Sequence, residues 1–219
     1  MKPTFLISEA IKESWRVLKS QIWVLVGLLI GYTIIVTILS LALPSDPANP
    51  GGVLISNLIS TIIGVLFSLG YTKNLFQAMN GEEPQFSAYG QESRKFIKAF
   101  LAGLLYAIVV VIGICLLVIP GIYLALRLQF YIPFIVDEDA GIMESLKRSW
   151  AITDKQVTKL LLVMLAMIGI ILLGLILLGI GIFIAAPLTY LIQLYIYRKL
   201  NISITSIEES SEEVEIIVE

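Results

Sequence analysis

Histidine is absent from the 219 residues, and cysteine occurs only once, as Cys115. Without histidine the chain has no imidazole for acid–base catalysis, for metal binding or for activating a nucleophile. A lone cysteine forms neither an intrachain disulfide nor a cysteine-cluster metal site. We therefore expect a protein that is not an enzyme, with no catalytic residue, no metal and no cofactor.

Charge is scarce as well, because only 15% of the residues are charged while 58% are hydrophobic and the mean hydropathy is +0.91. Soluble domains carry about 25% charged residues. Apolar runs recur along almost the whole chain, and the polar stretches between them are too short to form a soluble domain. A soluble globule and a single-pass anchor are both excluded. The composition predicts a polytopic membrane protein.

A transmembrane helix needs about 20 mostly apolar residues. Six such runs are bounded by proline, glycine or charge, namely 21–43, 53–71, 96–118, 120–136, 157–178 and 180–197. Very short links join the third to the fourth run, around Ile119–Pro120–Gly121, and the fifth to the sixth. The predicted fold is an all-α integral membrane protein with six transmembrane helices arranged as three hairpins. An amphipathic interfacial helix precedes each hairpin.

The basic residues predict the orientation, because short cytoplasmic loops carry the excess of Lys and Arg. Of the 15 basic residues, 14 flank the spans on one side and only Arg127 lies inside a span. Trp15, Trp23 and Trp150 lie at that same boundary, where indoles prefer to sit. We expect a multi-pass protein of the cell (inner) membrane with both termini cytoplasmic.

A seven-residue pattern, Glu-x-aliphatic-Lys-x-Ser-Trp, occurs twice at an offset of 135 residues. The residues that match between the two copies are Glu9, Lys12, Ser14 and Trp15 in the first and Glu144, Lys147, Ser149 and Trp150 in the second. The apolar spacing around each copy predicts an amphipathic helix at the inner interface. We expect a six-helix domain over 1–200 with repeat-like units 4–79, 83–137 and 139–200, and an acidic flexible cytoplasmic tail over 201–219. The alternative is that any interfacial helix favours Lys, Ser and Trp.

Arg127 lies six residues after Gly121 and nine before Val136, or roughly 9 and 13 Å at about 1.5 Å per residue. A guanidinium so near the membrane centre needs partners. None of the six predicted spans contains an acid, so we expect backbone carbonyls, the amides of Asn57 and Gln193, tyrosine hydroxyls, a lipid phosphate or an anionic ligand. The ligand- or lipid-binding candidates are Arg127, Asn57, Gln193 and Gln129, the last because Pro133 frees its carbonyl. Two hypotheses stay open: an anion site, or a purely structural arginine.

The stretch Leu117-Val-Ile-Pro-Gly-Ile-Tyr-Leu-Ala-Leu-Arg127 is followed by Phe130, Pro133 and the copy of the pattern that ends at Trp150. This stretch resembles the YciC-like proteins and the membrane domain attached to some glycerophosphodiester phosphodiesterases. The resemblance is most specific over 119–153, and it implies a helical inner-membrane domain of undefined biochemical role. The catalytic phosphodiesterase domain is absent, because that chemistry uses histidines.

Two function classes lead from these observations. The first is a non-catalytic scaffold or accessory subunit, and the alternative is a transporter or lipid-handling protein that binds an anionic ligand or lipid headgroup at Arg127. Proton coupling is disfavoured, because such relays need ionisable groups within the spans. The expected partners are membrane lipids, with a protein partner or homo-oligomer left open, and no nucleic acid.

Overall fold

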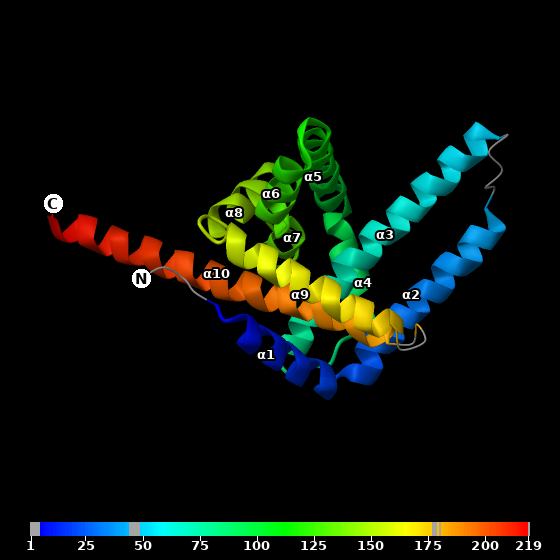
Figure 1. The fold of residues 1–219 in the computed structure, drawn as a ribbon, viewed down its shortest axis with the longest axis horizontal. Helices are drawn as coiled ribbons and strands as arrows, with labels where there is room; N and C mark the ends of the chain where they lie inside the picture. The colour runs from blue at the N-terminus through cyan, green and yellow to red at the C-terminus, as the bar shows by residue number, and fades with distance from the viewer. Residues whose placement is uncertain (1–4, 44–48, 177–178, 180, 219) are drawn as a thin grey trace.

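The computed structural model describes residues 5–43, 49–176, 179 and 181–218, with side chains described as far as residue 202. Over these ranges the chain is built from helices, with no strand (Figure 1). In chain order the helices are α1 (Ile7–Ser20), α2 (Ile22–Ala42), α3 (Pro50–Met79), α4 (Ser87–Glu92), a 3-10 turn η1 (Ser93–Lys95), α5 (Phe96–Leu116), α6 (Val118–Leu128), α7 (Tyr131–Glu138), α8 (Ile142–Ile152), α9 (Val157–Ile176) and α10 (Ile182–Val218). The expectation of an all-α fold is confirmed.

Within the described ranges, five helical stretches are long and apolar enough to cross a membrane. They are Ile22–Ala42, Pro50–Met79, Ser87–Leu116, Val118–Glu138 and Val157–Ile176. The sixth predicted span, 180–197, falls mainly in the first half of α10, which is not among the five. Pro187, Thr189 and Gln193 lower the hydropathy of that half, and Arg198 and Lys199 follow directly. Six spans therefore stay a prediction.

Helix α10 forms the centre of the molecule. It contacts α1, α2, α3, α8 and α9. Its buried side chains include Leu191, Ile192, Ile196, Tyr197 and Leu200, each exposed by 1% or less. Of the residues that lower its hydropathy, Pro187 and Thr189 are buried and Gln193 is partly buried.

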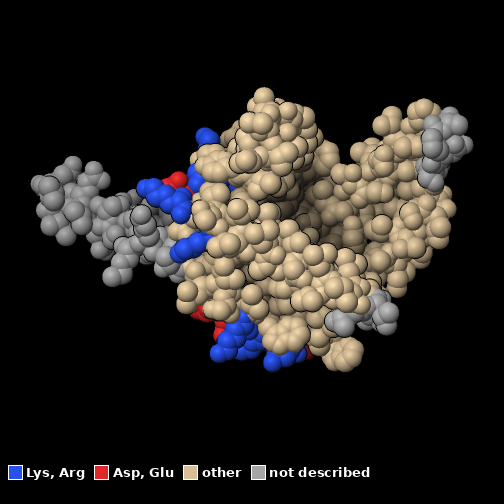
Figure 2. Space-filling view, viewed as in Figure 1, with Lys and Arg blue, Asp and Glu red and all other residues tan. Residues whose placement is uncertain are grey.

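Around α10, six of the other helices form two groups, α2 with α3 and α5 with α6, α7 and α8. Figure 1 shows α2 and α3 as a long arm that leads away from α5, α6, α7 and α8. On the face drawn in Figure 2, a deep hollow separates this arm from the α5–α6 group. On the same face the Lys and Arg side chains gather around α1, α8 and the start of α9, and the arm is free of them. Charge is thus confined to one end of the molecule on this face.

Glycines allow two helix pairs to close tightly. A Cβ atom on Gly121 would lie 2.8 Å from the backbone nitrogen of Ile114, so α5 and α6 meet at a distance that only glycine permits. A Cβ on Gly174 of α9 would similarly lie 2.9 Å from the carbonyl oxygen of Gly181. The link between α5 and α6 is Leu117 alone, in an extended conformation. The prediction of a break around Ile119–Gly121 was therefore misplaced, because Pro120 is accommodated in the first turn of α6.

Two of the predicted helices differ from those in the structure. The predicted continuous span 120–136 is interrupted between α6 and α7, where Ser149 bonds the backbone on both sides of the break, as described below. The amphipathic helix expected before the third span is only the six residues of α4 and the turn η1, which lead directly into α5. The flexibility expected of the acidic tail stays a prediction, and the segment 201–218 continues α10 as helix. Its many glutamates are good helix formers, which gives the physical reason.

Candidate functional site

Arg127 lies in the last turn of α6 and is 3% exposed. Its Nη1 atom lies 3.3 Å from Oδ1 of Asp154, in the link between α8 and α9. Its Cζ lies 4.1 Å from the centre of the Trp150 ring and 5.8 Å from that of Tyr123. The two rings meet edge to face, with centroids 6.0 Å apart. One carboxylate and two aromatic rings therefore surround the guanidinium.

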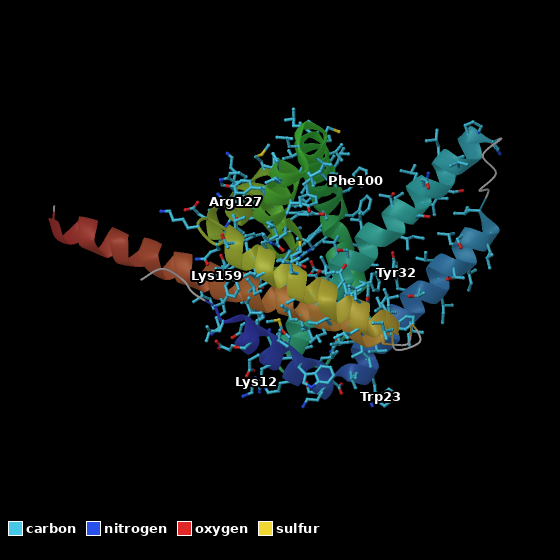
Figure 3. The ribbon with its side chains drawn as sticks, viewed as in Figure 1. Lys12, Trp23, Tyr32, Phe100, Arg127 and Lys159 are labelled. Atoms are coloured by element: carbon cyan, nitrogen blue, oxygen red, sulfur yellow. The ribbon has the colours of Figure 1, made fainter. Side chains whose placement is uncertain are left out.

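The expectation that Arg127 has no carboxylate partner was wrong. Asp154 lies outside the predicted spans, but α8 runs back along α6 and α7 and brings the residues after it to the level of Arg127. Figure 3 shows Arg127 on the α6–α8 side of the molecule, well away from Tyr32 in the α2–α3 arm. The predicted amide partners are not nearby either, because Asn57 is exposed on α3 and Gln193 contacts Gln129 instead.

Ser149 explains why the α6–α7 helix can break beside Arg127. Its hydroxyl donates to the carbonyl oxygen of Arg127 at 2.9 Å and accepts from the backbone N–H of Phe130 at 3.0 Å. The Thr153 hydroxyl lies 3.1 Å from the same Arg127 carbonyl. Buried backbone groups need such partners. The serine of the repeated pattern thus satisfies the backbone groups that the break leaves free.

The two copies of the pattern place equivalent residues in similar environments. Ser14 and Ser149 are both buried, at 2% and 0% exposed, whereas Trp15 and Trp150 are 40% and 39% exposed. The hydroxyl of Ser14, however, has no hydrogen-bond partner among the described residues. Lys12 and Lys147 are both exposed. The environments match, but only the second copy contacts a break in a neighbouring helix.

The glutamates of the two copies differ in their partners. Glu144 accepts a hydrogen bond from the backbone N–H of Gly141 and so caps the start of α8. Glu9 accepts a hydrogen bond from the Tyr195 hydroxyl at 2.7 Å and lies 3.5 Å from Nζ of Lys199, both on α10. The Tyr195 hydrogen bond is the main reason why the pKa of Glu9 is lowered. Glu9 therefore fastens α1 to the central helix.

Of the predicted ligand- or lipid-binding candidates, the structure brings Gln129 and Gln193 together. The Nε2 atom of Gln193 lies 3.4 Å from both the backbone oxygen and Oε1 of Gln129. The Gln129 carbonyl is the one that Pro133 was predicted to free, and an amide on α10 meets it instead of Arg127. Both glutamines line a cavity of about 220 Å³.

We call this cavity the polar chamber. Helices α3, α5, α7 and α10 and the α6–α7 break contribute its lining, which consists of Ser68, Thr72, Tyr106, Gln129, Tyr131, Ile132, Pro133, Tyr190, Gln193 and Leu194. Five of these residues carry a hydroxyl, two carry an amide, and none is ionised at neutral pH. A second cavity of about 310 Å³ shares Tyr190 and Gln193 with the chamber. Its other lining residues are Met164, Met167, Ile168 and Ile171 of α9 and Thr189 of α10.

Sequence reasoning found the two amides of the polar chamber and missed its hydroxyls as a group. The signal was present, because Ser68, Thr72, Tyr106, Tyr131 and Tyr190 are polar residues inside apolar stretches. They come from three different helices and the start of a fourth, so no local spacing connects them. Only the packing of α3, α5 and α7 against α10 gathers them.

Several acids at the charged end of the molecule are paired with bases or hydroxyls. Lys95 and Glu92 form a buried ion pair of 2.9 Å, and Nζ of Lys95 also donates to the carbonyl of Val136 at 2.8 Å. Lys98 bonds both the carboxylate and the carbonyl oxygen of Asp139 at 3.0 Å. Within the described residues, no group of three acids, cysteines or histidines is arranged to hold a metal ion.

One family model matches mainly the second half of the chain. The model of a domain of unknown function, DUF7847, matches residues 94–210, which is more than half of the sequence. The chain belongs to this family. The matched range holds Arg127, the second copy of the pattern and all of the polar chamber except Ser68 and Thr72. The family region thus coincides with α5 to α10.

Three mycobacterial proteins are similar over 101 residues. The uncharacterized protein Rv2560 of Mycobacterium tuberculosis strain H37Rv is 32% identical, over 46% of this chain and 31% of its own length. The uncharacterized proteins Mb2590 of Mycobacterium bovis and MT2637 of Mycobacterium tuberculosis strain CDC 1551 are 31% identical over the same shares. The match therefore spans less than a third of these relatives. No solved structure matches the chain.

Proposed function

We propose that the protein is a non-catalytic membrane protein that serves as a scaffold or accessory subunit. The observation that carries this proposal is that charged side chains form ion pairs between different parts of the fold. Ion pairs link α6 to the α8–α9 link, α5 to the α7–α8 turn, and α10 to α1. Charges that pair between helices serve the fold, although exposed pairs such as Lys98–Asp139 and Lys199–Glu9 each contribute little to stability.

The proposed topology has six spans, as three hairpins, with both termini in the cytoplasm. Glycine contacts close two helix pairs, α5–α6 and α9–α10, next to the links that join them. On the face drawn in Figure 2, the basic residues gather around α1, α8 and the start of α9. In this topology the first half of α10 is the sixth span, in which Thr189 is buried, Gln193 is partly buried and Tyr190 is 47% exposed. The resemblance to the YciC-like proteins is consistent with the same scheme.

The proposed internal repeat rests on the matched burial of Ser14 with Ser149 and of Trp15 with Trp150. Ser14 and Trp15 lie in α1, which precedes the apolar helices α2 and α3. Ser149 and Trp150 lie in α8, which precedes the apolar helices α9 and α10. The matched residues support a duplication of a unit made of one amphipathic helix and two spans. The short α4 makes the middle unit the least similar of the three.

Native mass spectrometry of the gently solubilised protein tests the scaffold proposal. A scaffold or accessory subunit should retain a second chain, either a partner or another copy, at a fixed ratio that survives exchange of lipid for detergent. A spectrum that shows only single chains with exchangeable lipids would contradict the proposal. Such a spectrum would favour the second candidate instead.

Lipid handling is the second candidate, and the observation that favours it is the polar chamber beside an apolar cavity. The anionic ligand expected at Arg127 belongs to this candidate. The buried Nε atom of Arg127 has no hydrogen-bond partner among the described residues, although Asp154 already neutralises the charge. If Arg127 binds an anionic lipid, the Arg127→Gln variant should fold and lose that lipid. Unchanged lipid retention with lower expression would indicate a structural arginine.

A further inference from the structure

The five hydroxyls of the polar chamber are left without protein partners. Within the described residues, no hydrogen bond is formed by the hydroxyls of Ser68, Thr72, Tyr106, Tyr131 or Tyr190. The Tyr106 and Tyr131 rings stack with centroids 5.3 Å apart, so their orientation is set by packing. Most of these residues are only partly enclosed, but water is scarce between apolar helices in a membrane, so five unpaired hydroxyls around one cavity favour an occupant that forms hydrogen bonds.

The occupant must be uncharged. The chamber lining contains no basic or acidic side chain, and its two amides and five hydroxyls offer only neutral donors and acceptors. A phosphate or an ammonium group would enter without a counter-charge, which is costly between apolar helices. A hydroxyl-bearing group meets no such cost, because each hydroxyl is both a donor and an acceptor.

The neighbouring cavity adds a second requirement. Tyr190 and Gln193 belong to both linings, and beyond them the wall consists of methionine and isoleucine side chains of α9. Tyr190 is 47% exposed, so this boundary reaches the outer surface of the helices. A hydrocarbon chain fits such a wall, because apolar side chains exclude polar groups there. Figure 1 shows α9 lying beside the first half of α10, which gives a chain a continuous path.

We infer that the polar chamber binds the hydroxyl headgroup of a neutral amphiphilic lipid, such as a diacylglycerol, with its hydrocarbon chain against α9 and α10. This inference rests on the second candidate function, lipid handling, and does not depend on the scaffold proposal. It also separates the lipid site from Arg127, which does not line the chamber.

A photoreactive dioleoylglycerol with a diazirine in its acyl chain tests the inference in nanodiscs of phosphatidylcholine. After irradiation, mass spectrometry of peptides should locate adducts on α9 or α10 near Met164, Met167 or Ile171. Unlabelled dioleoylglycerol should suppress the adducts, and phosphatidic acid at the same mole fraction should not. Equal suppression by phosphatidic acid, or adducts spread over all apolar helices, would overturn the inference.

Variants make the test specific for the chamber. Tyr131→Phe combined with Gln193→Leu removes one hydroxyl and one amide, and adduct yield should fall at least five-fold. Tyr123→Phe removes a hydroxyl on α6 outside both cavities and should leave the yield unchanged. If the double variant is poorly folded, Tyr190→Phe, which alters a partly exposed side chain, should still lower the yield at least two-fold. Unchanged yields in well-folded chamber variants would mean that the hydroxyls bind only water.

Photolabelling and native mass spectrometry test the lipid site and the scaffold proposal separately, so either proposal can fail without the other. A retained second chain without specific diacylglycerol adducts would support the scaffold and overturn the lipid site. Chamber-specific adducts on a protein that retains no second chain would give the opposite result.

Discussion

The Cζ atom of Arg127 lies 4.1 Å from the centre of the Trp150 ring, so an indole from α8 covers an arginine from α6. Trp150 is the last letter of the repeated pattern, and its equivalent, Trp15, is almost equally exposed. Among the described residues no cation stacks on Trp15. The pair of tryptophans therefore separates the contribution of the cation–π contact from that of an interfacial indole.

Trp150→Ala should destabilise the protein by about 1–2 kcal/mol more than Trp15→Ala, since partly desolvated cation–π contacts contribute about 0.5–2 kcal/mol and Arg127 also loses its cover. Denaturant unfolding in a mild detergent measures the difference. Equal losses for the two variants would show that the ring contributes only as an interfacial anchor.

The two equivalent serines lead to a sharper contrast. Ser149→Ala leaves the buried N–H of Phe130 without its acceptor, which should cost about 1–3 kcal/mol. Ser14→Ala removes a hydroxyl that has no partner and should be neutral or slightly stabilising. Unfolding free energies of the two variants and the wild type decide the matter. A neutral Ser149→Ala would mean that the α6–α7 break does not depend on that hydroxyl.

Lys95 and Glu92 form the most deeply buried ion pair that the structure describes, with side chains 6% and 5% exposed. Lys95→Met strands a buried carboxylate and should cost about 3–5 kcal/mol. Adding Glu92→Leu should recover part of this loss, because the uncompensated charge is then gone. A double variant that is less stable than Lys95→Met would contradict the assignment of the loss to a stranded charge.

Asp139 should make stability sensitive to acid. The hydrogen bond from Lys98 lowers its pKa below the usual 3.8, so the stabilising contribution is complete above that value and is lost as the pH falls further. Asp139→Asn should flatten the stability profile below about pH 4. Asparagine tolerates the left-handed backbone at this position, with φ 54°, so the variant isolates the charge. An unchanged profile would exclude this carboxylate as the cause.

The sequence predicted the helices better than the site. Apolar runs locate five helices, and the repeated pattern locates α1 and α8, because hydropathy and helical period are local properties. The break before Phe130 is not local, since the hydroxyl that permits it comes from Ser149 on another helix. Nothing near Arg127 in the sequence indicates that Asp154, 27 residues later, lies beside it.

The polar chamber was predictable only in part. Gln129 was proposed because of Pro133, and Gln193 because its amide was an expected partner of Arg127. Their mutual contact follows from the packing of the α6–α7 break against α10. Asn57, chosen by the same reasoning, is exposed on α3 and belongs to no polar cluster that the structure describes.

The central claim, that the chain crosses the membrane in hairpins with its basic side in the cytoplasm, is tested most directly by cysteine labelling in sealed cells. In a Cys115→Ser background, an impermeant maleimide should label the Gly51→Cys variant from outside. It should label the Glu83→Cys and Lys155→Cys variants only after the cells are permeabilised. Labelling of Glu83→Cys or Lys155→Cys in intact cells would contradict the topology and the functional proposals that depend on it.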